Sequence, residues 1–233
     1  MKYPLPYYLD VYSNALPFLA GSWNWTFVKK NLSGSALMFT FVVIGIITEA
    51  ISYVMVGQGM PNRWVLHFYH LAEYILLVYM FMNWQREYVI RGQNKSRLFF
   101  ILKPNVLLGS VVLYFAFWLG SKWSIEAWDA PASYTLTSAA FVFIVLSLLS
   151  LHQRVSTKSP SPNSIFRSFQ FWTAFGVLIY FSGSAVHFLI LHLLVNLPAE
   201  KFLEYWTLHW YVNVIANIAY AIGFFFLNPP AQA

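Results

Sequence analysis

The sequence contains no cysteine and little charge. Without cysteine among its 233 residues, the chain cannot form disulfide bonds, a thiolate nucleophile or a zinc–thiolate site. Only 9% of the residues are charged, whereas about 25% are charged in ordinary soluble domains. The first residues, with one Lys, two prolines and an interrupted apolar run, also lack the pattern of a cleavable signal peptide. With 59% apolar residues, the composition is typical of a polytopic membrane protein.

Six apolar runs are long enough to cross a hydrocarbon core about 30 Å thick, which takes about 20 helical residues. Because the runs are continuous rather than alternating, they favour helices over the strands of an outer-membrane barrel. A seventh, weaker run at residues 9–27 contains Asn14, Pro17 and Gly21, which predict a short, kinked first helix. A re-entrant or interfacial segment, and hence a bundle of six helices, is the alternative. The six runs cover residues 35–57, 63–85, 98–119, 134–152, 167–196 and 205–227.

The basic residues predict the orientation of the chain. With seven spans, ten of the fourteen Lys and Arg residues fall in the first, third and fifth connections. Cytoplasmic loops of membrane proteins carry the excess of Lys and Arg, so the N-terminus is predicted outside and the C-terminus inside. Basic loops that set the topology also explain the net charge of +6, and no nucleic-acid partner is expected. No connection is long enough for a soluble domain, so residues 1–233 are predicted to form a single transmembrane helical domain.

Ionisable side chains interrupt two of the apolar runs. Glu49 lies in the second span, and His67, His70 and Glu73 lie near the start of the third. At 1.5 Å per residue, Glu49, His70 and Glu73 lie about 12, 10 and 15 Å from the outer ends of their helices. Ionisable groups at this depth are costly in lipid and usually mark a site for a ligand, an ion or a proton.

Polar residues of two later runs fall at a similar depth. His187 lies about 13 Å, and His209 about 6 Å, from the outer ends of their helices. At 100° per residue, polar side chains of the third, sixth and last runs each share a face, and the three faces can turn inward together. They predict a polar cavity in the outer half of the bundle, open to the outside. The predicted ligand-binding residues are Glu49, His67, His70, Glu73, Tyr74, Tyr180, Ser184, His187, His209, Asn213 and Asn217.

Other interpretations of these residues stay open. One is an interhelical hydrogen-bond network that fixes the packing and binds nothing. Another is a metal site, since His70, Glu73, His187 and His209 offer ligands suited to zinc or iron. The spacing His-x-x-His-x-x-Glu is, however, not the His-Glu-x-x-His pattern of zinc hydrolases. Haem needs two histidines at matching depth, and retinal needs a lysine that the last run lacks. The sequence therefore leaves the cofactor unknown, and a chain without any cofactor is one of the open alternatives.

The run at residues 134–152, the fifth when residues 9–27 are counted first, contains no Asp, Glu, Lys or Arg, and the polar groups in its interior are Ser and Thr. A helix whose interior has no ionisable residue has the least need of protein neighbours in a membrane. This run is therefore predicted to be the helix that faces lipid.

Three stretches of the sequence carry a resemblance. They are FWTAFGVLIYFSG at 171–183, the His- and Tyr-rich HFYHLAEY at 67–74, and the Asn-rich NVIANIAY at 213–220. In these features the chain resembles a group of small, uncharacterised bacterial seven-helix membrane proteins related to the membrane input modules of sensor proteins. The resemblance implies a sensing function. No kinase or other output domain is recognised within residues 1–233, so signalling through a separate partner is expected.

The sequence thus predicts an all-α bundle of seven transmembrane helices in a bacterial inner (cytoplasmic) membrane. The expected function is a receptor-like or sensory module that binds a small molecule or lipid, with membrane lipids and a cytoplasmic or membrane signalling protein as partners. A transporter that carries protons or cations on Glu49 and Glu73 is the main alternative. A metal-dependent intramembrane enzyme comes third, and the chain is not expected to be an enzyme.

Overall fold

The computed structural model describes residues 4–30, 34–90, 103–156 and 165–227, with the side chains of all of these except 87–90. Every long element in this part of the chain is a helix, and six helices are long and apolar enough to cross a membrane. The all-helical prediction is therefore confirmed. Residues 31–33, 91–102 and 157–164, which hold part of the predicted basic connections, lie outside the described residues. The six helices are α4 (Ser35–Gly57), α5 (Arg63–Ile90), α6 (Pro104–Ser124), α7 (Ser133–Ser156), α9 (Phe169–Leu194) and α10 (Ala199–Phe225).

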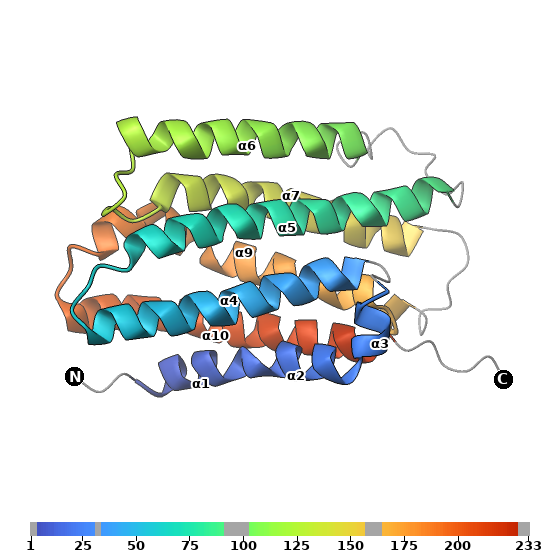
Figure 1. Cartoon of the computed structure of the whole chain (residues 1–233), viewed down its shortest axis with the longest axis horizontal. Helices are drawn as coiled ribbons and strands as arrows, with labels where there is room; N and C mark the ends of the chain where they lie inside the picture. The colour runs from blue at the N-terminus through green and yellow to red at the C-terminus, as the bar shows by residue number, and fades with distance from the viewer. Residues whose placement is uncertain (1–3, 31–33, 91–102, 157–164, 228–233) are drawn as a thin grey trace.

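The helices lie side by side in one bundle, and consecutive long helices run in opposite directions (Figure 1). The closest packing joins α7 to α9 and α9 to α10, and α4 packs against α5. Helix α6 lies at the edge of the bundle, against α5 (Figure 1). One end of the bundle, named here the α1 end, contains the start of the chain and the connections at residues 58–62, 125–132 and 195–198.

Proline and serine residues set the starts of three helices. Pro104 occupies the first turn of α6, where its missing N–H is not needed, so α6 begins later than residue 98. Pro198 precedes α10, which therefore begins at Ala199, six residues before the predicted start. The hydroxyl of Ser168 accepts a hydrogen bond from the Phe171 backbone N–H at 3.3 Å and caps α9.

The N-terminal segment consists of three short helices, α1 (Leu5–Ser13), α2 (Ala15–Trp23) and α3 (Trp25–Val28). It lies along α10 and α4 (Figure 1). The break between α1 and α2 falls at Asn14, and Pro17 is its physical cause, because a proline cannot donate a hydrogen bond to the carbonyl four residues earlier. The predicted kink is present, and none of the three helices alone has the length of a span.

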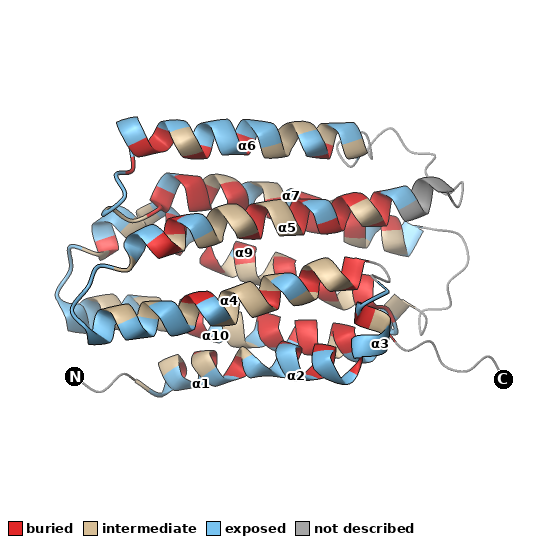
Figure 2. Cartoon of the chain, viewed as in Figure 1, coloured by how far each residue is buried: buried red, intermediate tan, exposed pale blue. Residues whose placement is uncertain are grey.

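The prediction that residues 134–152 form the lipid-facing helix is wrong. In α7, which contains them, 56% of an 18-residue apolar stretch is buried, against 11% of the corresponding stretch in α4 (Figure 2). Helix α7 is buried because many of its side chains are small. Ala139, Ala140 and Ser147 are almost completely buried, and such side chains let neighbouring helix backbones approach closely. The absence of charge in this run therefore reflects a central position among other helices.

Glycines allow close approach between α9 and α10. A Cβ atom added to Gly176 would lie 2.5 Å from the Tyr220 ring, and one added to Gly183 would lie 2.6 Å from the Val212 side chain. Real Cβ atoms do not come so close to a neighbouring atom, so either substitution would push the two helices apart. This contact fixes the position of the Tyr220 ring.

We expect Gly176→Ala to lower the free energy of unfolding by about 1–3 kcal/mol, the usual cost of overfilling a packed interface. Thermal unfolding of the purified protein measures the effect. The matched control is Gly109→Ala in α6, where an added Cβ meets no atom within 4 Å. This control should leave stability unchanged or raise it by at most about 1 kcal/mol, because Ala favours helix more than Gly does. Equal effects of the two substitutions would contradict the prediction.

Candidate functional site

A polar cavity of about 260 Å³ lies between α1, α4, α5, α9 and α10. It is near the α1 end, since Glu49 lies eight residues before the end of α4 and His70 lies seven after the start of α5. No Lys or Arg is found among the described residues that line it. Its polar lining consists of Asp10, Asn14, Thr48, Glu49, Ser52, Tyr69, His70, Glu73, Tyr180, His209, Asn213, Asn217 and Tyr220.

Side-chain hydrogen bonds join the N-terminal segment to α10. The Asn213 amide donates to the Asp10 carboxyl group. One turn further along α10, the Asn217 amide donates to Ser13 Oγ at 2.9 Å and to Asn14 Oδ1 at 2.8 Å. Asp10, Ser13 and Asn217 are buried, so these contacts replace water as the partners of the polar groups.

Asn14 also connects the N-terminal segment to α4. Its amide Nδ2 donates to Glu49 Oε2 at 2.8 Å, while its carbonyl oxygen accepts from Asn217. One asparagine at the break between α1 and α2 therefore links three elements. The Glu49 carboxyl group reaches this position from the largely exposed helix α4, and Glu49 is only partly buried.

Two residues of the cavity lining, Ser52 and Glu73, have a buried side-chain oxygen without a hydrogen-bond partner among the described residues. His70 Nδ1 lies 3.2 Å from Glu73 Oε2, within one turn of α5. The other oxygen, Oε1, is buried and has no hydrogen-bond partner among the described residues, although Glu73 as a whole is 2% exposed. Leaving a buried polar atom unpaired costs about 1–3 kcal/mol, more for a charged group. Such an atom needs a partner, and the described residues do not supply one.

Aromatic rings and one histidine complete the walls. Tyr69, Tyr180 and Tyr220 line the cavity from α5, α9 and α10. His209 lies against the Tyr180 ring, with centroids 5.7 Å apart, and its Nδ1 is 2.9 Å from Ser184 Oγ. Ser184 thus orients the imidazole from behind and does not itself line the cavity.

The structure brings seven of the eleven predicted residues to the cavity lining: Glu49, His70, Glu73, Tyr180, His209, Asn213 and Asn217. The other four lie elsewhere. Ser184 is behind His209, and Tyr74 stacks on Tyr114 on another side of α5, with ring centroids 3.7 Å apart. His187 Nε2 donates to the Tyr205 carbonyl at 2.9 Å, and its buried Nδ1 has no partner among the described residues.

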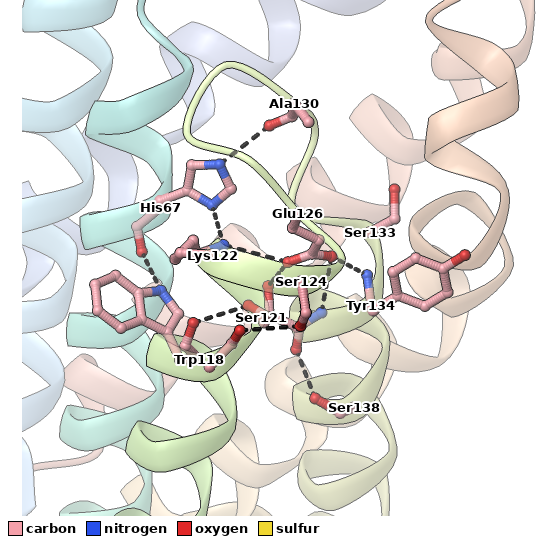
Figure 3. A network of polar contacts seen from close by, with 12 residues as sticks. His67, Trp118, Ser121, Lys122, Ser124, Glu126, Ala130, Ser133, Tyr134 and Ser138 are labelled. Atoms are coloured by element: carbon pink, nitrogen blue, oxygen red, sulfur yellow. Dashed lines mark hydrogen bonds and ion pairs between the residues drawn. The ribbon is translucent and has the colours of Figure 1, made fainter.

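His67 belongs to a different polar group at the α1 end of the bundle (Figure 3). Its Nε2 donates to the Ala130 carbonyl at 3.0 Å, so Nδ1 is free to accept from Lys122 Nζ at 2.8 Å. The same lysine donates to Glu126 Oε2 at 3.2 Å. Trp118 Nε1 donates to the His67 carbonyl at 3.1 Å. These bonds hold the 125–132 connection against α5, which is a structural role.

Glu126 caps the start of α7 within this group (Figure 3). Its carboxyl group accepts from the backbone N–H groups of Tyr134 and Thr135 and from the Thr135 hydroxyl at 2.8 Å. The first N–H groups of a helix have no partner within the helix, and a carboxylate there also interacts favourably with the helix dipole. The side chains of Lys122 and Glu126 are at most 2% exposed.

The N-terminal segment contributes Asp10 and Asn14 to the cavity lining, and neither is among the predicted ligand-binding residues. A signal was present, because Asp10, Ser13 and Asn14 are spaced three and four residues apart and thus share one helical face. Tyr69 was missed as well, although it adjoins His70.

The four residues named as potential metal ligands are not brought together around one point. Within the described ranges, no three His, Asp or Glu side chains are placed to hold a metal ion. His70 and Glu73 form a pair, whereas His187 is directed to a backbone carbonyl. The chemistry that the cavity offers is hydrogen bonding and the binding of positive charge.

We expect Glu126→Ala to lower the free energy of unfolding by about 3–5 kcal/mol, because it leaves a buried lysine without its counter-ion and α7 without its cap. Lys122→Met should cost less, since Glu126 would still accept from the start of α7. Thermal unfolding tests this order. The control is Lys201→Ala, which removes an exposed ion pair with Glu204 and should have no measurable effect. A control as damaging as Glu126→Ala would refute the assignment.

The asparagine contacts predict a local effect on the N-terminal segment. Asn217→Ala should increase hydrogen exchange of backbone amides in α1 and α2, because it removes both bonds from α10 to Ser13 and Asn14. Amides of α7 and α9 should keep their protection. The matched control is Asn196→Ala, since Asn196 is exposed and its amide donates to the backbone carbonyl of His192, four residues earlier. Uniform exchange increases across all helices would show that Asn217 acts on the whole bundle instead.

Comparison with known proteins identifies no relative of this chain. No protein-family model, no curated protein and no solved structure matches it. What the chain binds is therefore inferred below from its own residues: three carboxyl groups, three tyrosines, two histidines and three asparagines around one cavity.

Proposed function

We propose that this chain is a receptor-like membrane module that binds a small molecule in the polar cavity. The observation that carries the proposal is that Glu73 lines the cavity and that its buried Oε1 lacks a partner among the described residues. A bound molecule would supply that partner. The cavity volume of about 260 Å³ lies just below the range of about 300–1,000 Å³ typical of small-molecule sites. The resemblance to membrane input modules of sensors supports the receptor-like role.

The proposed topology has seven spans, with α1–α3 together forming the first. This segment follows α10 along the bundle (Figure 1), as a broken span would. In the proposed orientation the α1 end is outside and the opposite end is in the cytoplasm of a bacterial cell; the excess of Lys and Arg in the first, third and fifth connections supports it. The cavity would lie in the outer half of the membrane, and a cytoplasmic or membrane partner would receive the signal.

Cation- or proton-coupled transport is the second candidate, because Asp10, Glu49 and Glu73 line the same cavity. Membrane transporters use such acids as carriers. The packing along α5 favours the receptor. Between Glu73 and the Gln85–Gln153 hydrogen bond near the opposite end, Leu77 and Phe81 are at most 1% exposed and belong to the apolar core. A transporter would need to open this layer in every cycle.

The test is to fill the cavity from a position that has no polar role. Gly45 lines the cavity, and a Cβ added there meets only the Tyr69 side chain, at 3.5 Å. We expect native mass spectrometry of the wild-type protein, released from lipid nanodiscs, to show a co-purified small molecule at one copy per chain. Gly45→Leu should abolish this adduct by occupying its space.

Gly109→Leu is the matched control, because no atom lies within 4 Å of an added Cβ at that position of α6. It should keep the adduct. An adduct that persists in Gly45→Leu would place the ligand outside the cavity and contradict the proposal. Proton-driven uptake into vesicles that is lost in Glu73→Gln would instead establish the transporter.

A further inference from the structure

A second space adjoins the polar cavity. It is a groove of about 930 Å³ between the N-terminal segment and α4, on the outside of the bundle. Its walls are mainly apolar, and most of the side chains on the α4 wall are exposed (Figure 2). In a membrane such a face is in contact with lipid chains. Representative wall residues are Val11, Ala15 and Phe18 on one side and Val43, Ile47 and Ala50 on the other.

Small residues and selective contacts keep the groove open. Ala15 and Ala50 face it from opposite walls. Helix α1 is held to α10 through Asn213 and Asn217, away from α4. Helix α2 meets α4 at Phe39, which Gly21 approaches and on which the Phe18 ring stacks. Between these contacts the Asn14–Glu49 hydrogen bond joins the N-terminal segment to α4, and the groove lies beside this bond.

The groove and the cavity share a boundary. Four residues line both spaces: Asn14, Ile46, Glu49 and Ser52. The hydrogen bond from Asn14 to Glu49 Oε2 at 2.8 Å lies at this boundary. A molecule that occupies both spaces would place its polar end among the acids and tyrosines and its apolar end in the lipid-facing groove. The pair of spaces thus fits an amphiphile.

The charge of the lining selects the polar end. Asp10, Glu49 and Glu73 face the cavity, and neither Lys nor Arg is among the described residues lining either space. A phosphate or carboxylate head group would find no counter-ion here. An ammonium group would find carboxylates, the unpartnered oxygen of Glu73, and tyrosine rings, whose faces attract cations.

We propose that the ligand is a single-chain alkylammonium amphiphile, with its ammonium group in the polar cavity and its alkyl chain in the groove. This inference rests on the proposed binding function and adds the chemical class of the ligand and its route. The amphiphile reaches the cavity sideways from the lipid, past Asn14 and Glu49. Because neither Lys nor Arg is among the described residues of the groove lining, a phosphodiester would find no counter-ion among them, which disfavours ordinary phospholipids as occupants.

The test compares dodecylammonium with ethylammonium, which has the same head group and almost no tail. Both are titrated calorimetrically into protein in phosphatidylcholine nanodiscs, and the signal from empty nanodiscs is subtracted. Both amines should bind saturably, at one per chain, and dodecanol should not. Glu49→Gln should weaken both amines about tenfold or more, because a charge-assisted hydrogen bond to the head group is lost.

Blocking the groove separates the two parts of the proposal. Ala50→Phe should weaken dodecylammonium about tenfold or more and leave ethylammonium unchanged, which also shows that the variant is folded. The matched control is Ala116→Phe, on an exposed face of α6 away from both spaces, and it should behave as wild type. If Ala50→Phe and Ala116→Phe bind dodecylammonium equally, the groove does not hold the tail.

The remaining outcomes distinguish the two proposals. If neither amine binds while an adduct sensitive to Gly45→Leu is present, the ammonium assignment is overturned and the binding function stands. The same holds if that adduct is an anion. If neither amine binds and no adduct depends on Gly45, both proposals fail. Dodecanol binding as tightly as dodecylammonium would show that the acids do not select the head group.

Discussion

Polar side chains in the apolar helices must find their partners inside the protein, and this requirement shapes the bundle around the N-terminal segment. Helices α1 and α2 are too short and too interrupted to be fixed by apolar packing alone. They are joined to α10 through Asn213 and Asn217, and to α4 through the contact of Asn14 with Glu49. Each such bond contributes modestly in a membrane, about 0.6 kcal/mol on average. Their combined effect is directional, because they hold α1 against α10 and leave a space beside α4.

The two polar groups at the α1 end of the bundle differ in how completely their members are paired. The side chains of His67, Lys122 and Glu126 are each bonded to other described residues: to one another, to a helix start and to a loop carbonyl. Buried side chains that are paired in this way help to specify one arrangement of the chain. The cavity is different, since Glu73 keeps an unpaired oxygen and His70 and Glu49 are only partly covered. A binding site needs polar groups that can still form hydrogen bonds with a ligand, and the cavity lining has such groups.

The helical period and the distribution of apolar runs were sufficient to predict the long helices and much of the cavity lining. Residues one turn apart, such as His70 with Glu73 and Asn213 with Asn217, do share a face that points inward. The period could not show that His67, on the same face as His70, is turned to Lys122. That contact depends on how the 125–132 connection folds back over α5, which is long-range information. Burial of α7 was mispredicted for a related reason: low polarity is compatible with both lipid and a helical interior, and only packing distinguishes them.

The double use of Asn14 has a thermodynamic consequence. Its amide is bonded to Glu49 while its carbonyl oxygen is bonded to α10, so the residue at the helix break is also part of the cavity wall. A ligand that engages Glu49 competes with one of the bonds that position α1. By linkage, the free energy with which the ligand loosens α1 equals the free energy by which displacement of α1 strengthens ligand binding. A change in membrane thickness or tension that moves α1 would therefore change the affinity for the ligand. Conversely, ligand binding would move α1 and so alter any contact that another protein makes with its outer face.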